Sequence, residues 1–415
     1  MDSIPPELKY KILRAAVGVF RDQPHLFMRT REIICCLSRE WRILGLSDTA
    51  IWSHVFVSPR LQRVDIVRRA MRGPSEIDIY LELLDPVVEP SFLSWFADEI
   101  GPLLLRCCEL RVVSPHRSAS MDMFATLATL DGTSLEFVHL DVRPVDLSQQ
   151  WWDTAVPPIF HGLLPHLRSF SLRRNFLLPS ATPFLANIQE LKLHSLHSLY
   201  TPTIGTMLDV LRATPSLVRL YMRDVELSDW RTVLPAPNLP HLTHLGVVGL
   251  SMGVIDLCSL ITAPSLHTFL LEYGDEDPLD YMHIVWNDIF LTVTTAIIRT
   301  ASWDPNEFGR IMSRFSSAVR FDLRRNDQMI TVAFHHVVLT WHRCFPKAEL
   351  VVLPTSLTPG VTAALLTDPN RTSASPNLHI VAPSSLHDRS TFEETYVLLG
   401  NVVSRPVIEN VDYWN

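Results

Sequence analysis

The sequence predicts a mixed α+β or α/β solenoid, built from short strands and return segments and preceded by a small helical module. Two patterns support this class: an apolar kernel returns repeatedly after residue 100, and apolar residues recur at helical spacing before residue 57. A chain of 415 residues that is 47% hydrophobic can bury a large core. Its length indicates about two to three domains unless the repeats form one array.

The helical module begins at a pair of prolines. Pro5 is held in an extended conformation by the proline after it, whereas Pro6 suits the first helical position. Glu7 follows where the helix dipole favours an acid. Apolar residues then recur at helical spacing, at Leu8, Ile12, Leu13, Ala16 and Phe20. We therefore expect a helix that starts at Pro6.

A second helix is expected between residues 26 and 45. Its apolar stripe comprises Leu26, Thr30, Ile33, Ile34, Leu37, Trp41 and Leu44, and Gly45 suits the C-cap. About fifty residues bury only a thin core, so the two helices need a partner or a following domain for stability.

Residues 1–57 carry a combination of motifs. Ile4-Pro5-Pro6-Glu7-Leu8 opens the first helix, Leu37-Ser38-Arg39-Glu40-Trp41-Arg42 closes the second, and Trp52 follows Trp41 by eleven positions. This segment resembles an F-box, although family members commonly have Cys where this chain has Ser38. The resemblance implies a helical hairpin that docks onto the Skp-type adaptor of cullin-RING ubiquitin ligases. The implied adaptor-binding residues are Ile4, Pro6, Leu8, Ile12, Leu37, Trp41 and Trp52. A generic helical hairpin is the alternative.

Residues 58–100 are predicted to link the module to the array and to form its N-terminal cap. Val64 to Arg72 has the pattern of a short helix, and Glu76 to Leu83 alternates as a strand does. Phe92 to Leu105 is expected to return as a helix.

Residues 101–390 contain a degenerate repeat. Its clearest copies are Pro165-His-Leu167-Arg-Ser-Phe170-Ser-Leu172 and three similar segments that begin at Pro215, Pro240 and Pro264. Weaker copies are anchored at Cys107, Leu135, Ile188, Ala318, Ala348 and Leu378, with Trp286/Ile289/Leu291 possible between. This kernel resembles leucine-rich repeats, which implies one parallel strand and one return segment in each unit. Return segments are expected at 204–213 and 254–261. An ordinary α/β domain with a parallel sheet is the alternative.

Residues 391–415 are predicted to cap the array at its C-terminal end. Thr391-Phe-Glu-Glu394 has the spacing of a capping box, and an apolar run from Tyr396 to Val403 follows it.

The residues between the inward anchors are expected on one open face, because side chains alternate along a strand. Solenoids commonly bind partners on such a face, and Arg and Tyr are enriched at binding hot spots. The predicted target-binding residues are Glu190, Lys192, Arg219, Tyr221, Arg223 and His244. A merely solvated face is the alternative.

One segment fits a catalytic motif. Gly249-Leu250-Ser251-Met252-Gly253 matches the G-x-S-x-G nucleophile elbow of serine hydrolases. A tight turn between repeat units explains it more simply, and no oxyanion-hole segment such as HGGG occurs. The later acid and histidine that a triad needs would be arbitrary choices, such as Asp277 and His379. We therefore expect no catalytic residue, with a Ser251 hydrolase as the lesser alternative.

The histidines and cysteines do not form zinc motifs. Short spacings join His194 with His197, His241 with His244, and His335 with His336, but no second pair completes a site. The six cysteines show no CxxC spacing, which indicates reduced thiols in a reducing compartment. We expect no metal and no cofactor.

The overall composition narrows the choice of partners. A net charge of −8 argues against nucleic-acid binding. The N-terminus lacks the features of a signal peptide, and no apolar stretch is long enough to span a membrane. We expect a cytoplasmic or nuclear protein that acts as the substrate-recognition subunit of an SCF-type ubiquitin ligase. It would bind the adaptor and an unknown target protein. A repeat scaffold without a ligase role is the alternative.

Overall fold

The computed structural model describes residues 4–18, 24–72, 76–85, 87–142, 160, 164–174, 183–196, 202–228, 236–249, 251–273, 290–300, 314–322, 347, 349–352 and 379–381. The chain divides into two compact units, Met1–Tyr200 and Thr201–Asn415. The predicted cap at residues 391–415 lies outside the described residues.

Three helices and a 3₁₀ turn form the N-terminal module: α1 (Pro6–Gly18), α2 (Pro24–Leu37), α3 (Arg39–Ser47) and η1 (Thr49–Trp52). The predicted start at Pro6 is confirmed, but the single second helix was wrong. Ser38 has an extended backbone, and its hydroxyl accepts a hydrogen bond from the Trp41 N–H at 3.2 Å. Serine caps a new helix in this way, so the pattern forms two helices. The second of them continues through Gly45, which is therefore not a C-cap.

Apolar side chains from all these segments share one small core. It contains Leu13, Val17, Phe27, Ile34, Trp41, Ile51 and Trp52. Polar contacts also join α1 to α3. Arg14 forms two hydrogen bonds with the Asp48 carboxylate at 2.7 and 2.9 Å, and the buried Lys9 ammonium contacts Glu40. The module is thus a packed three-helix unit.

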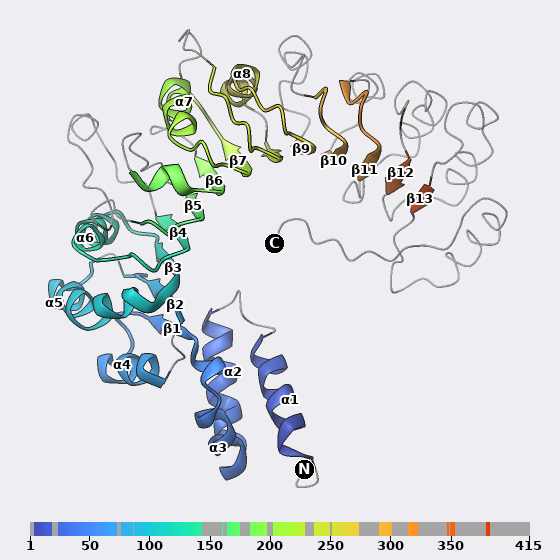
Figure 1. Ribbon diagram of the computed structural model, residues 1–415. Coiled ribbons are helices and arrows are strands. Elements are labelled where there is room, and N and C mark those ends of the chain that lie inside the picture. The colour runs from blue at the N-terminus through green and yellow to red at the C-terminus, as the bar shows by residue number, and fades with distance from the viewer. Residues whose placement is uncertain are drawn as a thin grey trace. The chain divides into compact units, whose positions relative to one another are not determined.

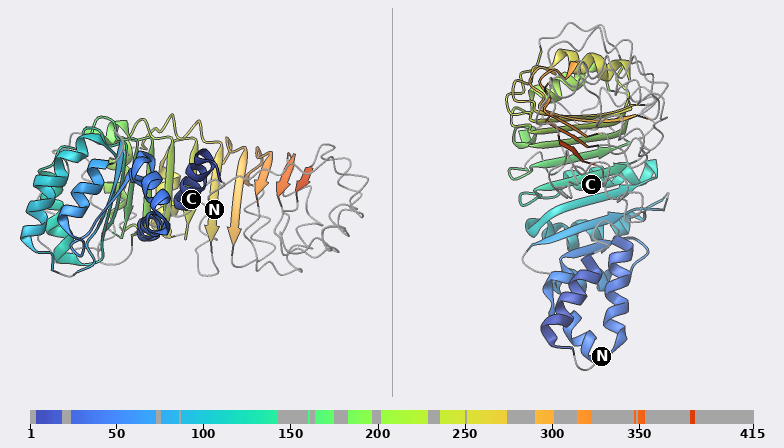
Figure 2. Two further views of the ribbon diagram at one scale, coloured as in Figure 1. Left: turned by 90° about the horizontal axis from the view of Figure 1, so that it is seen from below. Right: turned by 90° about the vertical axis from the view of Figure 1, so that its right-hand side faces the viewer.

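The rest of the first unit is a parallel ladder with helices along one side (Figures 1 and 2). Its strands are β1 (His54–Val57), β2 (Ile77–Glu82), β3 (Cys107–Ser114), β4 (Phe137–Val142), β5 (Ser169–Arg173) and β6 (Glu190–Leu196). The helices are α4 (Arg63–Arg72), α5 (Pro90–Trp95) and α6 (Arg117–Ala128). The segment 92–105 is helical as expected, but α5 changes into a π-helical turn, η2 (Phe96–Ile100), and then a 3₁₀ segment, η3 (Gly101–Arg106).

The ladder begins earlier than the repeat pattern indicates. β1 lies inside the segment assigned to the helical module, and it pairs in parallel with β2. β1 carries no leucine kernel, and three of its four residues are buried in a nearly continuous run.

The second unit contains another parallel ladder. Its strands are β7 (Arg219–Val225), β8 (His244–Val248), β9 (Thr268–Tyr273), β10 (Thr295–Thr300), β11 (Arg320–Asp322), β12 (Leu350–Val352) and β13 (His379–Val381). The expected return segments are helices α7 (Ile204–Arg212) and α8 (Met252–Leu260).

A turn before each of the strands β4 to β11 explains the proline of the sequence kernel. The N–H of the first buried anchor donates to the carbonyl three residues earlier, as from Leu242 to Leu239 at 3.1 Å. Pro240 is the second residue of this turn, where its fixed φ is favourable. The same hydrogen bond precedes other strands, with donors at Leu135, Leu167, Ile188, Leu217, Leu266, Val293 and Ala318.

The position of this turn shows that the possible repeat copy at Trp286/Ile289/Leu291 was wrong. Leu291 is 54% exposed and occupies the turn position that proline has elsewhere. The buried anchors of β10 are Val293, Ala296 and Ile298. The small Ala296 occupies the position where the clear copies have Leu or Phe, so the repeat kernel is not recognisable in the sequence here.

Candidate functional site

The N-terminal module exposes apolar side chains on each of its three α-helices. α1 exposes Leu8 and Ile12, α2 exposes Ile33 and Leu37, and α3 exposes Ile43 and Leu46. Members of each pair are three or four residues apart, so each pair lies on one face of its helix. Exposed apolar clusters in a stable module are typical of surfaces that bind another protein.

The predicted adaptor-binding residues fall into two groups. Leu8, Ile12 and Leu37 are 48%, 47% and 62% exposed, so they are available to a partner. Trp41 and Trp52 are buried in the core of the module, where the Trp52 indole Nε1 donates to the Gly45 carbonyl at 2.8 Å. Ile4 is partly exposed, and the Pro6 side chain lies outside the described residues. The two tryptophans therefore hold the module together.

The sequence pattern did not identify Ile33, Ile43 and Leu46 as surface residues. It placed Ile33 in the apolar stripe of the second helix. Ile33 and Ile34 are adjacent, and a helix turns by about 100° per residue, so only one of them can face the core. Ile34 does so. The break at Ser38 then sets a new rotation for α3, which no periodicity across residues 26–45 could have given.

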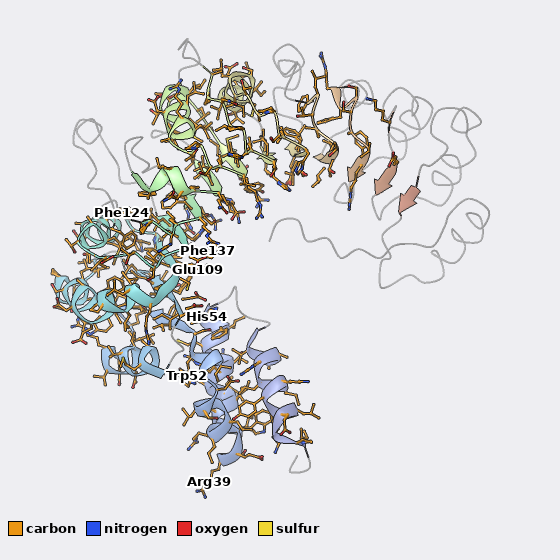
Figure 3. All side chains as sticks on the ribbon, in the orientation of Figure 1. Arg39, Trp52, His54, Glu109, Phe124 and Phe137 are labelled. Carbon is orange, nitrogen blue, oxygen red and sulfur yellow. The ribbon has the colours of Figure 1, made fainter. Side chains whose placement is uncertain are left out.

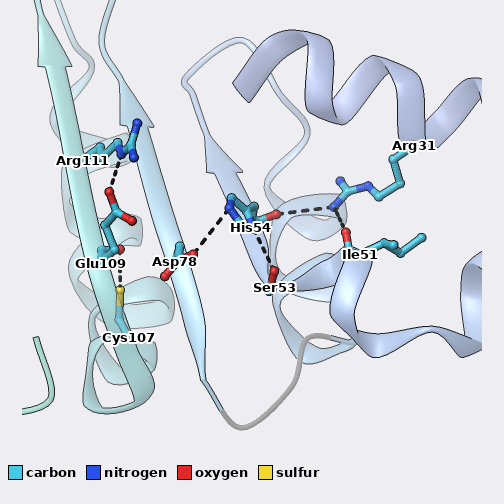
Figure 4. A network of polar contacts seen from close by, with 8 residues as sticks. All are labelled: Arg31, Ile51, Ser53, His54, Asp78, Cys107, Glu109 and Arg111. Atoms are coloured by element: carbon cyan, nitrogen blue, oxygen red, sulfur yellow. Dashed lines mark hydrogen bonds and ion pairs between the residues drawn. The ribbon is translucent and has the colours of Figure 1, made fainter. Parts of the chain in front are cut away.

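A buried arginine joins the module to the first strand. Arg31 of α2 is 1% exposed, and its Nη1 donates to the carbonyls of Ile51 and His54 at 3.3 and 3.4 Å (Figure 4). Its guanidinium lies 4.2 Å from the centroid of the Trp52 ring. Trp52 and His54 lie at this junction (Figure 3). Because the cation is both hydrogen-bonded and stacked, it fixes the module against β1.

On the helix-free face of the first ladder, strand register aligns side chains into rows. The first row is His54, Asp78, Glu109, Phe137, Ser169 and Glu190. The second row is Phe56, Tyr80, Arg111, His139, Ser171 and Lys192. Neighbours within a row belong to strands about 4.8 Å apart. The predicted frame for Glu190 and Lys192 agrees with this register.

Ion pairs cross between the rows of this face. Glu109 contacts Arg111, and Glu190 lies 3.3 Å from the Lys192 ammonium. Asp141 is only 8% exposed and lies 2.8 Å from the Arg174 Nε. The face is therefore polar and mixed in sign, as the sequence indicates.

His139 lies in the centre of the second row. Its Nδ1 is 2.8 Å from the Ser171 hydroxyl. Burial, together with the positive charges of Arg111, Arg173 and Lys192, lowers the pKa of His139 to about 4. The imidazole is therefore neutral at physiological pH.

The second ladder has a different face. Arg219, His244, Thr268 and Thr295 share one row, and Tyr221, Gly246, Leu270 and Ile297 share the next. Tyr221 is only 6% exposed and forms an apolar cluster with Val248, Leu270 and Ile297. The Arg223 guanidinium lies 5.8 Å from the centroid of the Tyr221 ring. Of the predicted target-binding residues in this unit, Arg219 is exposed, Arg223 and His244 are half-buried, and Tyr221 is buried.

Ser251 of the G-x-S-x-G segment caps α8. Its hydroxyl donates to the Val225 carbonyl at 2.9 Å and accepts from the Val254 N–H at 3.3 Å. Gly249 has a φ of +70°, and a Cβ at Gly253 would come within 2.5 Å of the Leu227 carbonyl oxygen. Both glycines and the serine thus fit the turn against the preceding repeat. Asp277 lies outside the described residues.

In the described part of the chain, the His, Cys, Asp and Glu side chains form no group of three placed to hold a metal ion. None of the helices in this part is both long enough and apolar enough to cross a membrane.

No family model matches the chain, and no curated protein matches its sequence. The F-box resemblance of residues 1–57 therefore stays a prediction. Among solved structures, the chain is similar to the leucine-rich repeat-containing protein LegL7 from Legionella pneumophila, with 12% identity and a TM-score of 0.44. The match covers 85% of this chain and 99% of that chain.

Proposed function

We propose that this chain is the substrate-recognition subunit of an SCF-type cullin-RING ubiquitin ligase. The observation that carries the proposal is the exposure of paired apolar side chains on every α-helix of the F-box-like module. These side chains bind the Skp-type adaptor. The open face of the ladders binds the target protein.

In this function the chain catalyses no chemical step. It holds the lysines of the target near the ligase's conjugating enzyme, which raises their effective concentration. Such a role needs a stiff connection between the adaptor site and the target site. The buried Arg31 contacts supply this connection to the first ladder, because they bind α2 to the carbonyls of Ile51 and His54.

Adaptor binding tests the proposal. Leu37→Glu places a charge on a side chain that is 62% exposed, so the module should stay folded. Loss of one anchor at an interface costs about 2 kcal/mol, so we expect adaptor affinity to fall about thirtyfold. Titration of the purified adaptor against the full chain by isothermal calorimetry measures this change.

Leu105→Glu is the matched control, because Leu105 is also an exposed leucine, at 52%, and lies outside the module. It should leave adaptor affinity unchanged. If both variants bind as the parent does, the adaptor site does not include Leu37. If the parent chain does not bind the adaptor, the ligase role is wrong. A repeat scaffold without a ligase role would then be the better description.

A further inference from the structure

A small pocket lies within the first unit, between the first turn of α2 and the open face of β1–β3. Aromatic rings form much of its lining. The Phe27 ring stacks on the His54 ring with centroids 4.7 Å apart, and the Phe56 ring stacks on the Tyr80 ring at 5.3 Å. Ring faces carry partial negative charge and attract cations.

Two carboxylates line the same pocket. Asp78 and Glu109 are register partners on β2 and β3, so their strands are about 4.8 Å apart. Asp78 lies 3.4 Å from the His54 Nε2, and Glu109 contacts the Arg111 Nε through its Oε1 atom (Figure 4). An ionised carboxylate has about four lone-pair sites and can accept a bidentate pair of hydrogen bonds from a guanidinium.

Arg111 also lines the pocket, where the carboxylates of Asp78 and Glu109 outnumber it. Burial and the charges of Glu82 and Asp141 raise the pKa of Tyr80 to about 12, with Arg111 as a smaller opposing influence. The phenol therefore stays neutral, and the acids outweigh the arginine at its hydroxyl.

We propose that this pocket binds an arginine side chain of the target protein. The proposal rests on the target-binding role given above and names the chemistry that the face selects. A guanidinium is flat enough to stack on the Tyr80 ring, and its fork of donors can reach carboxylates on two adjacent strands. Its aliphatic stem is buried against the aromatic walls. Arg31 shows the same chemistry within this chain, since its guanidinium lies 5.9 Å from the Phe27 centroid.

Three small probes test the proposal on the full chain. They are the N-acetyl, N-methylamide derivatives of arginine, citrulline and glutamate, observed by saturation-transfer NMR. Citrulline has nearly the shape of arginine without the charge. We expect dissociation constants in the millimolar range for the arginine probe, at least fivefold weaker binding of citrulline, and no binding of glutamate.

Variants of the pocket complete the test. Asp78→Asn keeps the shape of the side chain and should weaken arginine binding about fivefold, whereas Tyr80→Leu should weaken it about threefold. Glu136→Gln is the matched control, because Glu136 is also a carboxylate beside an arginine, 3.9 Å from the Arg168 Nη1, and it does not line the pocket. Thermal unfolding checks that each variant is folded.

Three results would overturn the proposal: equal binding of citrulline and arginine, preferential binding of glutamate, or unchanged arginine binding by the folded Asp78→Asn variant. Adaptor affinity measured on the same samples separates this outcome from a failure of the ligase role. If the arginine probe binds and the adaptor does not, the pocket stands and the ligase role is wrong.

Discussion

The two ladders share one backbone arrangement and differ in the chemistry of the central row on the open face. In the first unit this row includes Arg111, His139, Ser171 and Lys192. In the second unit the corresponding row is Tyr221, Gly246, Leu270 and Ile297, in which Leu270 is 0% exposed. A parallel strand thus carries either a polar row or a buried apolar row on its open face.

This difference changes the assignment of individual residues. Tyr221 is of a type enriched in binding hot spots, but its burial beside Leu270 gives it a packing role. In the proposed function, the target contacts of the second ladder are therefore assigned to the flanking row that contains Arg219 and His244. The central row of the first ladder instead includes the partly exposed Arg111 and Lys192.

The largest effect is expected for the apolar row. Leu270→Ala should lower the free energy of unfolding by about 3 kcal/mol, because a fully buried leucine leaves a cavity. Urea unfolding followed by tryptophan fluorescence and circular dichroism measures the change. Ser171→Ala, in the central row of the other ladder, should cost only about 1 kcal/mol, the value of one hydrogen bond. Equal costs would contradict the contrast between the rows.

The second-largest effect is expected in the pH dependence of the free energy of unfolding. The pKa of His139 is lowered to about 4 in the folded chain, while an unfolded histidine titrates near 6.5. Between these values the unfolded chain binds more protons, so stability falls on acidification through this window, by about 2–3 kcal/mol.

His139→Gln removes this titration, so its stability should depend less on pH between 6.5 and 4. Unfolding midpoints in urea at several pH values give the comparison. On the second ladder, burial and the nearby His267 and Arg219 also lower the pKa of His244, which is more accessible. A His244→Gln variant should therefore show a smaller change. Parallel pH curves for the parent chain and His139→Gln would exclude a buried neutral imidazole.

A smaller effect is expected for target capture. Replacing Glu190 by Gln and Lys192 by Ala should reduce the amount of captured target about fivefold, since rim charges each contribute modestly to binding. Arg219→Ala should have a similar effect, whereas the conservative Tyr221→Phe should have none, because that ring is buried. Quantitative mass spectrometry after affinity purification measures captured partners, with adaptor recovery as the internal control. A strong loss with Tyr221→Phe would reverse the assignment.

The smallest effect is expected for the ion pair on β3. Glu109→Gln should change the free energy of unfolding by less than about 0.5 kcal/mol, because partly exposed ion pairs contribute little. The same urea experiment measures it, and added salt should reduce even this difference. A loss above about 2 kcal/mol would show that the pair is structurally essential.

Several features of this fold follow from local sequence, because the interactions that set them join residues close in the chain. Pro6 starts α1, and Pro240 occupies the turn whose hydrogen bond leads into β8. The anchors of the clear repeats, such as Leu242 and Leu245, are fully buried as their spacing indicates. The alternation of polar residues also gave the correct frame for the open face of the ladders.

Other features depend on contacts between residues far apart in the chain, so no local pattern predicts them. β1 belongs to the ladder because it pairs with β2, more than twenty residues later. The same limit applies to side chains. Leu37 and Trp41 share one helical stripe in the sequence, but the break at Ser38 places them on different helices, and only the tryptophan packs into the core shared with α1. The pocket of Phe27 and Asp78 likewise forms only where α2 meets the open face of β1 and β2, because the buried Arg31 holds them together.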